Sequence, residues 1–237
     1  MPSRCRSAAA VAVAAEQSGP VDPVDPAENA RPTGPADLTS AVPVGARGRF
    51  AALLARAAGW RVVGELPRTG IFIGAPHTSN WDFVLTLIVL WHAGVPPRVL
   101  VKRELFWWPL GPLLRALGAL PTDRGAGGGL VRRLIAEASA DRAFALVIAP
   151  DGTRRKTDHW KSGFYRIAMA SGLPVTLGFI DGPTRTTGVG PTITLTGDVR
   201  ADMDVIRAFY ADKHGVRPGR GSTPVLREER QDPSPTP

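Results

Sequence analysis

Short runs of apolar residues alternate with helix-like segments along most of this chain, and this alternation limits the possible folds more than any other feature. Ile71–Ala75 and Phe144–Ala149 are continuous apolar runs of strand length, whereas Leu130–Ala140 repeats its apolar residues at helical spacing. Strands that alternate with helices indicate an α/β sheet with helices on its faces. We expect strands at residues 71–75, 98–101, 144–149, 175–179 and 193–195, and helices at 79–92, 130–140, 162–171 and 202–214.

The charged residues are unevenly distributed. The 237 residues carry a formal net charge of +8, from 29 Lys and Arg against 21 Asp and Glu. Residues 1–45 have a balance of −2 and residues 217–237 a balance of +1, which leaves +9 on residues 46–216. A basic domain of this kind indicates an anionic partner, such as a phosphorylated small molecule, a membrane surface or a nucleic acid.

The two ends of the chain differ in composition from the stretch between them. Residues 1–45 are rich in Pro, Ala, Gly and Asp, with almost no large apolar residues, so we expect a disordered segment. Its apolar run of Ala and Val after Arg6 resembles a signal peptide only weakly. Residues 217–237 are predicted to be a flexible tail. The stretch 46–216 is long enough for one well-buried domain.

Several common chemistries lack the residues that they need. A lone Cys5 excludes an intramolecular disulfide and a thiolate metal site, and the four histidines lack metal-ligand spacing, so no metal is expected. The glycine run at residues 125–129 lacks the Gly-Lys-Ser/Thr ending of a P-loop, and no Gly-x-Ser-x-Gly elbow is present. Asp151-Gly-Thr resembles a phosphatase loop, but Ala149 stands where that nucleophile would be.

His77 and Asp82 form a candidate catalytic pair. Because His77 follows a predicted strand and precedes a predicted helix, it should lie at the carboxyl edge of the sheet, where open α/β sheets bind ligands. With Ser79 as the N-cap, the Asp82 carboxylate points back toward the loop, where it can fix one ring nitrogen of His77. The other nitrogen is then free to act as a base on a substrate hydroxyl. Ser79-x-x-Asp82 is equally a capping-box-like arrangement, which needs no catalysis.

A basic cluster follows the second apolar run. Pro150-Asp-Gly-Thr-Arg154 predicts a tight turn, whose backbone N–H groups and Arg154 guanidinium suit a phosphate. Lys161 belongs to the same cluster. Arg124 ends another short apolar segment and could close on the same anion. The alternative for each of these cations is an ordinary solvated surface charge.

Together these segments resemble the glycerophospholipid acyltransferase family, and the chain is similar to 1-acylglycerol-3-phosphate acyltransferases. The resemblance covers roughly residues 60–210 and rests on ordered blocks. It implies a single α/β domain with a mixed central sheet flanked by helices. The matching blocks are His77 and Asp82 with four residues between them, Lys102–Leu105 with the segment that ends at Arg124, the turn at 150–154, and Gly172–Val175.

The resemblance also implies roles for these residues. His77 would be the general base and Asp82 its orienting partner, so that an acceptor hydroxyl attacks the thioester of acyl-CoA or of acyl carrier protein. The expected acceptor is a lysophospholipid-like molecule, foremost lysophosphatidic acid, which would become phosphatidic acid. No cofactor is expected beside the acyl donor. The phosphate or head group of the acceptor would be held by Arg124, Asp151, Gly152, Thr153 and Arg154, with Lys102 and Lys161 as further candidates.

Three departures from the family pattern affect the acceptor more than the chemistry. Asp151 replaces the usual Glu, Pro76 stands where many members have Asn, and Gly178 lies where a second Pro is common. The shorter Asp151 either moves the anchoring point of the acceptor or only preserves a turn contact. Two alternatives therefore stay open: a catalytically inactive lipid-binding domain of the same fold, and an acyltransferase for another acceptor such as a lyso-aminolipid.

Two apolar segments next to basic residues predict contact with a membrane surface. Phe50–Trp60 can form a short interfacial helix, and Leu105–Leu110 carries aromatic residues beside Lys102 and Arg103. The alternative is that Phe106 and Trp108 fill the core. No apolar run is long enough to cross a bilayer. We expect a cytoplasmic protein bound peripherally to the anionic inner face of the cell membrane, and no nucleic-acid partner because no binding module is recognisable.

Overall fold

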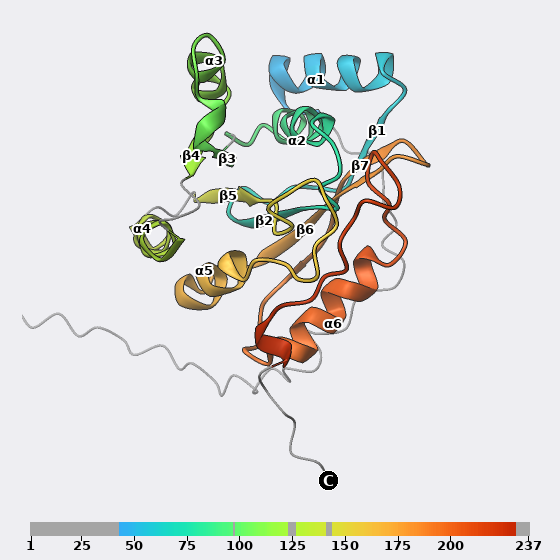
Figure 1. Cartoon of the computed structure of the whole chain (residues 1–237). Helices are drawn as coiled ribbons and strands as arrows, with labels where there is room; N and C mark the ends of the chain where they lie inside the picture. Colours follow the sequence, from blue (N-terminus) through green and yellow to red (C-terminus); the bar gives the residue numbers. More distant parts are fainter. Residues whose placement is uncertain (1–42, 97, 123–126, 141–143, 231–237) are drawn as a thin grey trace, which may run out of the picture.

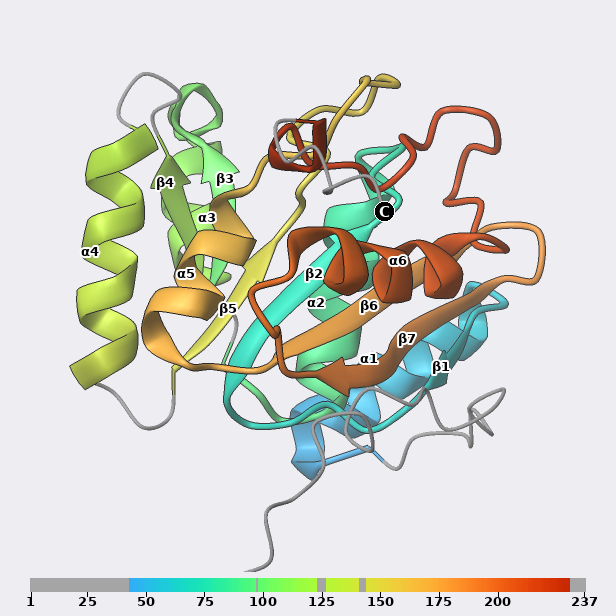
Figure 2. The ribbon, with the colours of Figure 1, turned by 90° about the horizontal axis from the view of Figure 1, so that it is seen from below.

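A single mixed sheet forms the centre of the molecule. The computed structural model describes residues 43–96, 98–122, 127–140 and 144–230. Within them, seven strands lie in the order β1-β7-β6-β2-β5-β3-β4 (Figure 2). The mixed α/β fold class predicted from the sequence is confirmed. The strands are β1 (Arg61–Val63), β2 (Gly70–Ala75), β3 (Val99–Lys102), β4 (Ala119–Thr122), β5 (Ala145–Ile148), β6 (Val175–Asp181) and β7 (Thr186–Ile193).

The directions of the strands decide where the chemistry can take place. β2 pairs in parallel with β5 on one side and with β6 on the other. β3 is parallel to both β5 and β4, whereas β7 is antiparallel to β6 and β1 is parallel to β7. The carboxyl ends of β2, β3, β4 and β5 therefore open on one edge of the sheet, which is where such sheets bind ligands.

Helices cover both faces of the sheet (Figure 1). The helices α1, α2 and α3 lie on one face, and α4, α5 and α6 lie on the other. The α-helices of the described residues are α1 (Gly45–Ala57), α2 (Trp81–His92), α3 (Leu110–Ala116), α4 (Gly127–Ala140), α5 (Gly163–Ser171) and α6 (Val199–Tyr210), and the described 3-10 turns are η1 (Arg103–Leu105) and η3 (Glu228–Arg230).

The sheet has a hydrophobic core on each of its two faces. Side chains along β2 enter these two cores in alternation, because successive side chains of a strand point to opposite faces. Ile71 and Ile73 are fully buried in the core under α4, α5 and α6. Phe72 packs on the opposite side with Leu90 of α2. Burial on both faces explains why β2 and β5 are continuous apolar runs in the sequence.

Most predicted elements agree with the structure to within a few residues, but the last strand does not. A strand was expected at residues 193–195, whereas β7 spans Thr186–Ile193 and is rich in Thr and Gly. Its partner is β6, and the Thr187 hydroxyl donates to the carbonyl oxygen of Phe179 at 3.0 Å. The predicted end of α5 at Gly172 is confirmed: this residue has a φ of 67°, a left-handed conformation that glycine adopts without steric cost.

The segment after residue 216 packs against the domain, where a flexible tail was expected. Leu226 is fully buried in the main core. The backbone N–H of Trp160 donates to the carbonyl oxygen of Val225 at 2.7 Å, and a guanidinium nitrogen of Arg207 donates to the carbonyl oxygen of Pro224 at 2.9 Å. These contacts are non-local, so the composition of the segment did not indicate them. The rest of this predicted tail (231–237) and residues 1–42 of the predicted disordered segment lie outside the described residues.

In the part of the chain that the structure describes, none of the helices has both the length and the apolar character needed to span a bilayer.

Candidate active site

The predicted site residues come from loops at the carboxyl ends of three neighbouring strands. His77 follows β2, the turn 150–154 follows β5, and Lys102 is the last residue of β3. Because Ile73 of β2 lies opposite Ile148 of β5, the two loops begin side by side. They border a cavity of about 830 Å³, which we call the main cavity. Of the predicted residues, His77, Asp82, Lys102, Gly152, Thr153, Arg154 and Lys161 line it.

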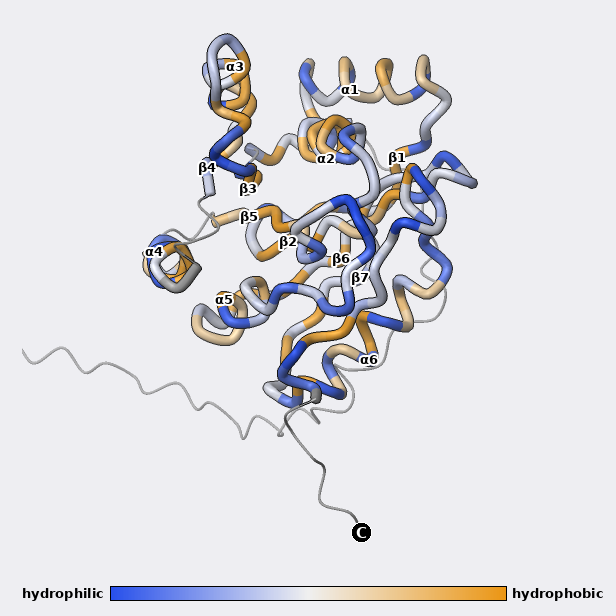
Figure 3. The backbone as a smooth tube through the Cα atoms, viewed as in Figure 1, coloured by the Kyte–Doolittle hydropathy of each residue, from blue (hydrophilic) through white to orange (hydrophobic). Residues whose placement is uncertain are grey.

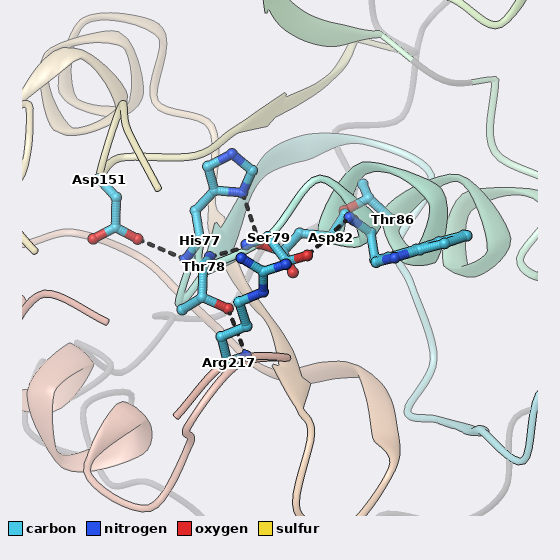
Figure 4. A network of polar contacts seen from close by, with 8 residues as sticks. His77, Thr78, Ser79, Asp82, Thr86, Asp151 and Arg217 are labelled. Atoms are coloured by element: carbon cyan, nitrogen blue, oxygen red, sulfur yellow. Dashed lines mark hydrogen bonds and ion pairs between the residues drawn. The ribbon is translucent and has the colours of Figure 1, made fainter. Parts of the chain in front are cut away.

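His77 and Asp82 are in direct contact (Figure 4). Nδ1 of His77 lies 3.1 Å from Oδ2 of Asp82. The imidazole is one-quarter exposed, whereas the Asp82 side chain is almost completely buried. With an acceptor at Nδ1, the favoured neutral tautomer carries its proton there and leaves Nε2 unprotonated. The pair therefore has the arrangement that a general base requires.

Asp82 also fixes the loop that carries His77. The same Oδ2 atom accepts hydrogen bonds from the backbone N–H groups of Thr78, at 2.6 Å, and Ser79, at 2.7 Å. Helix α2 begins at Trp81, so its N-cap is Asn80 rather than Ser79. The catalytic and the capping interpretations of the sequence are thus compatible, because one carboxylate oxygen serves both. The second oxygen, Oδ1, is buried and has no hydrogen-bond partner among the described residues.

Asp151 has a different place from the one predicted for it. Its carboxylate is buried and does not line the main cavity. Oδ2 accepts from the backbone N–H of His77 at 2.8 Å, and Oδ1 accepts from Nε1 of Trp160 at 3.0 Å. Both oxygens of this carboxylate accept hydrogen bonds from protein N–H groups. Its negative charge would repel a phosphate. The turn-contact alternative for Asp151 fits this geometry, and the role of a direct acceptor ligand does not.

Burial affects the protonation of Asp151. Removal from water raises the pKa of its carboxyl above the ordinary value of 3.8, against the lowering effect of hydrogen bonds from His77, Ser222 and Trp160.

The indole of Trp160 packs edge-on against Tyr210, and the Tyr210 hydroxyl donates to the carbonyl oxygen of Gly178 at 2.8 Å. Asp151 is thus the link between the His77 loop and the core beneath it.

The turn after Asp151 presents cations to the main cavity. Gly152 has a φ of 62°, and a Cβ atom there would lie 2.8 Å from Cε of Lys161, so glycine lets the Lys161 side chain cross the turn. Arg154, Lys161 and Arg166 line the cavity and are exposed to solvent. Lys102 lines it too, but its Nζ pairs with Glu104 at 2.8 Å. Arg124, the remaining predicted ligand, lies outside the described residues.

The deeper part of the main cavity is apolar, and we did not predict it. Its apolar lining includes Leu130 and Leu134 of α4, Val99 of β3 and Val147 of β5. The sequence predicted the apolar face of α4, but it did not indicate which strands this face packs against. Arg166 and Trp160 were missed as well, because nothing in their sequence surroundings marks them. A polar mouth with an apolar interior suits an amphipathic ligand.

No cluster of three or more His, Cys, Asp and Glu side chains that could hold a metal ion occurs in the described ranges. The chemistry that the described side chains support is removal of a proton from a hydroxyl placed at Nε2 of His77, close to a group of cations.

Comparison with known proteins shows what this chain is similar to. Residues 61–176 match the family model described as Acyltransferase. The chain is also similar to the solved crystal structure of the 1-acyl-sn-glycerophosphate (LPA) acyltransferase, PlsC, from Thermotoga maritima, with 16% sequence identity and a TM-score of 0.47. That similarity covers 68% of this chain and 76% of the other. The matched family segment contains β1 to β5, α5 and the residues of the main cavity from His77 to Arg166.

Proposed function

Because residues 61–176 match the acyltransferase family model, we propose that the protein moves a fatty acyl group from a thioester to a hydroxyl of a lysophospholipid-like acceptor. The donor is acyl-CoA or acyl carrier protein, and the acceptor that fits best is lysophosphatidic acid. The observation that carries the proposal is the contact between His77 and Asp82 at the mouth of the main cavity, 3.1 Å from Nδ1 to Oδ2.

The proposed step needs only the two substrates. Nε2 of His77 removes the proton of the acceptor hydroxyl, and the oxygen forms a bond to the thioester carbonyl carbon. The tetrahedral intermediate then breaks its carbon–sulfur bond, and the imidazolium returns the proton to the leaving thiolate. Asp82 stabilises the imidazolium during this cycle. General-base catalysis typically contributes about 10²–10⁴-fold, so positioning of the substrates supplies a further share of the acceleration.

The shape and charge of the main cavity support an anionic, lipid-like substrate. Arg154 and Lys161 at its mouth offer charge-assisted hydrogen bonds to a phosphate. Leu130 and Leu134 line its interior, where an acyl chain would bury apolar surface at roughly 25 cal/mol per Å². A free head group without a chain would leave this interior unused.

The experiment that tests the proposal is acyl transfer by the purified full-length protein. Radiolabelled acyl-CoA and acyl carrier protein are offered with lysophosphatidic acid, a lyso-aminolipid and other lysolipids, and wild type is compared with His77→Ala. His159→Ala is the matched control, because His159 also lines the main cavity but has no contact with Asp82. We expect turnover by wild type and the control, and a loss of 10²-fold or more in His77→Ala, by the usual size of general-base catalysis.

Two outcomes would contradict the proposal. Equal turnover in wild type and His77→Ala would remove His77 as the base. Absence of turnover with every donor and acceptor, in protein that binds lysolipid, would favour the inactive lipid-binding domain. Turnover with a lyso-aminolipid but not with lysophosphatidic acid would keep the acyl transfer and change the acceptor.

We further propose that α1 and the loop before α3 attach the protein to the inner face of the cell membrane. Helix α1 and helix α3, which follows this loop, lie on the same side of the sheet. Figure 3 shows hydrophobic residues along both helices. Phe50 and Leu53 of α1 are 53% and 64% exposed, and Trp108 is 83% exposed. The alternative that Trp108 fills the core is therefore wrong. Arg47, Arg49 and Arg56 lie on α1 as well, and basic side chains near an anionic leaflet contribute about 1 kcal/mol each.

A further inference from the structure

Four arginines converge on a second cavity of about 390 Å³, next to the His77 loop. We call it the arginine cavity. Arg154 and Arg155 reach it from the turn after β5, and Arg217 and Arg220 reach it from the segment that follows α6. Its remaining wall includes Ser79 and Trp81 at the start of α2. Arg154 lines the main cavity too, so the two cavities share a wall.

The charged side chains that line the arginine cavity are all positive. No acidic residue lines it, and none of its four guanidinium groups is ion-paired with a carboxylate of the described chain. The nearby carboxylates of Asp82 and Asp151 are buried and accept hydrogen bonds from protein donors. The amino end of α2 adds a partial positive charge. Guanidinium groups gathered without counter-charges match a ligand with more than one phosphate charge.

The fold holds the segment with Arg217 and Arg220 in place. The backbone N–H of Arg217 donates to the Thr78 hydroxyl at 3.1 Å, and the backbone N–H of Gly215 donates to the carbonyl oxygen of Ile180 at 3.0 Å. Figure 4 shows the Arg217 side chain beside Ser79 and Asp82. A Cβ atom at Gly215 would lie 2.7 Å from the Thr78 side chain, so the segment and the His77 loop are in close contact. The cation cluster is therefore a product of tertiary packing.

We propose that the arginine cavity binds the phosphate groups of a coenzyme A-type acyl donor, an inference that rests on the acyl transfer proposed above. Both substrates of that reaction carry phosphate, and the protein has two neighbouring groups of cations. The acceptor needs its single phosphate close to its hydroxyl, beside an apolar interior, as in the main cavity. The arginine cavity is polar apart from Trp81, whose side chain is 64% exposed and offers a face on which an adenine can stack.

The test uses the full-length double variant Arg217→Gln/Arg220→Gln. Its matched control is Arg132→Gln/Arg200→Gln, which removes the same charge from exposed positions on α4 and α6 that line neither cavity. Binding of coenzyme A, 3′-dephospho-coenzyme A and pantetheine is measured by calorimetry, without turnover. We expect the Arg217/Arg220 variant to lose about tenfold in affinity for coenzyme A, because it loses charge-assisted hydrogen bonds that solvent partly screens. Pantetheine, which has no phosphate, should bind both variants equally.

Steady-state kinetics distinguishes an effect on binding of the acyl donor from an effect on binding of the acceptor. In the Arg217/Arg220 variant, KM for acyl-CoA should rise about tenfold, as the binding loss requires, while kcat and KM for lysophosphatidic acid stay within about twofold. A rise in KM for lysophosphatidic acid alone would assign the arginine cavity to the acceptor and overturn the proposal. Equal coenzyme A affinity in the two double variants would also overturn it. Because the calorimetric arm needs no turnover, a protein without acyltransferase activity that still binds coenzyme A through these arginines would refute only the proposed function.

Discussion

The backbone N–H of His77 donates a 2.8 Å hydrogen bond to the carboxylate of Asp151, although 74 positions separate the two residues. This bond joins the loop after β2 to the loop after β5. Nε1 of Trp160 donates a hydrogen bond to the other carboxylate oxygen at 3.0 Å. The histidine of the candidate site and the turn with Arg154 are therefore fixed relative to each other by one buried carboxylate.

Asp82→Asn should lower both kcat and thermal stability, whereas His77→Ala should lower kcat alone. The Asp82 carboxylate accepts from the backbone N–H groups of Thr78 and Ser79, and loss of hydrogen bonds to a buried charge costs about 1–3 kcal/mol. Thermal melts and steady-state kinetics of both variants measure this difference. The exposed Asp158→Asn is the control. An Asp82→Asn protein with the melting temperature of wild type would contradict the capping role.

Asp151→Asn should change how stability depends on pH. Because burial raises the pKa of the Asp151 carboxyl above 3.8 in the folded protein, the stability that its protonated form contributes is fully present below 3.8 and is lost as the pH rises through the raised pKa. Asparagine does not titrate. The free energy of unfolding of wild type, minus that of the variant, should therefore decrease from acidic to neutral pH. Urea unfolding at a series of pH values measures this difference, and a constant difference would refute the prediction.

Arg154→Ala should raise KM for an anionic acceptor more than KM for the acyl donor. Arg154 lines both cavities, but it is the one arginine of the arginine cavity that also lines the main cavity with His77, where the acceptor phosphate is proposed to bind. We expect about a tenfold rise for lysophosphatidic acid, from the loss of one partly exposed charge-assisted hydrogen bond. Lys156→Ala removes an equal charge two residues away and lines neither cavity, so it should behave like wild type. A larger effect on the donor would refute this placement of the head group.

Trp107→Ala/Trp108→Ala should weaken binding to anionic vesicles without loss of stability. The two indoles are 59% and 83% exposed, so they contribute little to the core. In a bilayer interface each would bury its ring, and we expect at least a tenfold loss of vesicle affinity, because burial of such a side chain contributes about 1.5–3 kcal/mol. Cosedimentation with vesicles of anionic lipid measures it. Met169→Ala, exposed on α5 on the opposite face of the sheet, is the control, and equal binding of both variants would contradict the proposed membrane face.

The sequence predicted local relationships well. The contact between His77 and Asp82 joins residues five positions apart, across the start of one helix, so spacing and capping rules were enough to anticipate it. Gly172 ends α5 as expected, for the same local reason. β7 was misplaced because its threonines and glycines resemble a loop. Pairing with β6 decides its conformation, and Gly190 leaves room for the ring of Phe209, which lies 2.2 Å from where a Cβ atom would stand.

The sequence by itself determined the α/β class, the order of the blocks and the edge of the sheet at which His77 and Arg154 lie, since all of these follow from periodicity and from the direction of parallel strands. Only the tertiary structure decided that Asp151 holds His77 and Trp160, that α4 closes an apolar interior, and that Arg217 and Arg220 return to the His77 loop. Each of these depends on packing between segments far apart in the chain. No local pattern of residues records such packing, because its free energy depends on the folded neighbours of each segment.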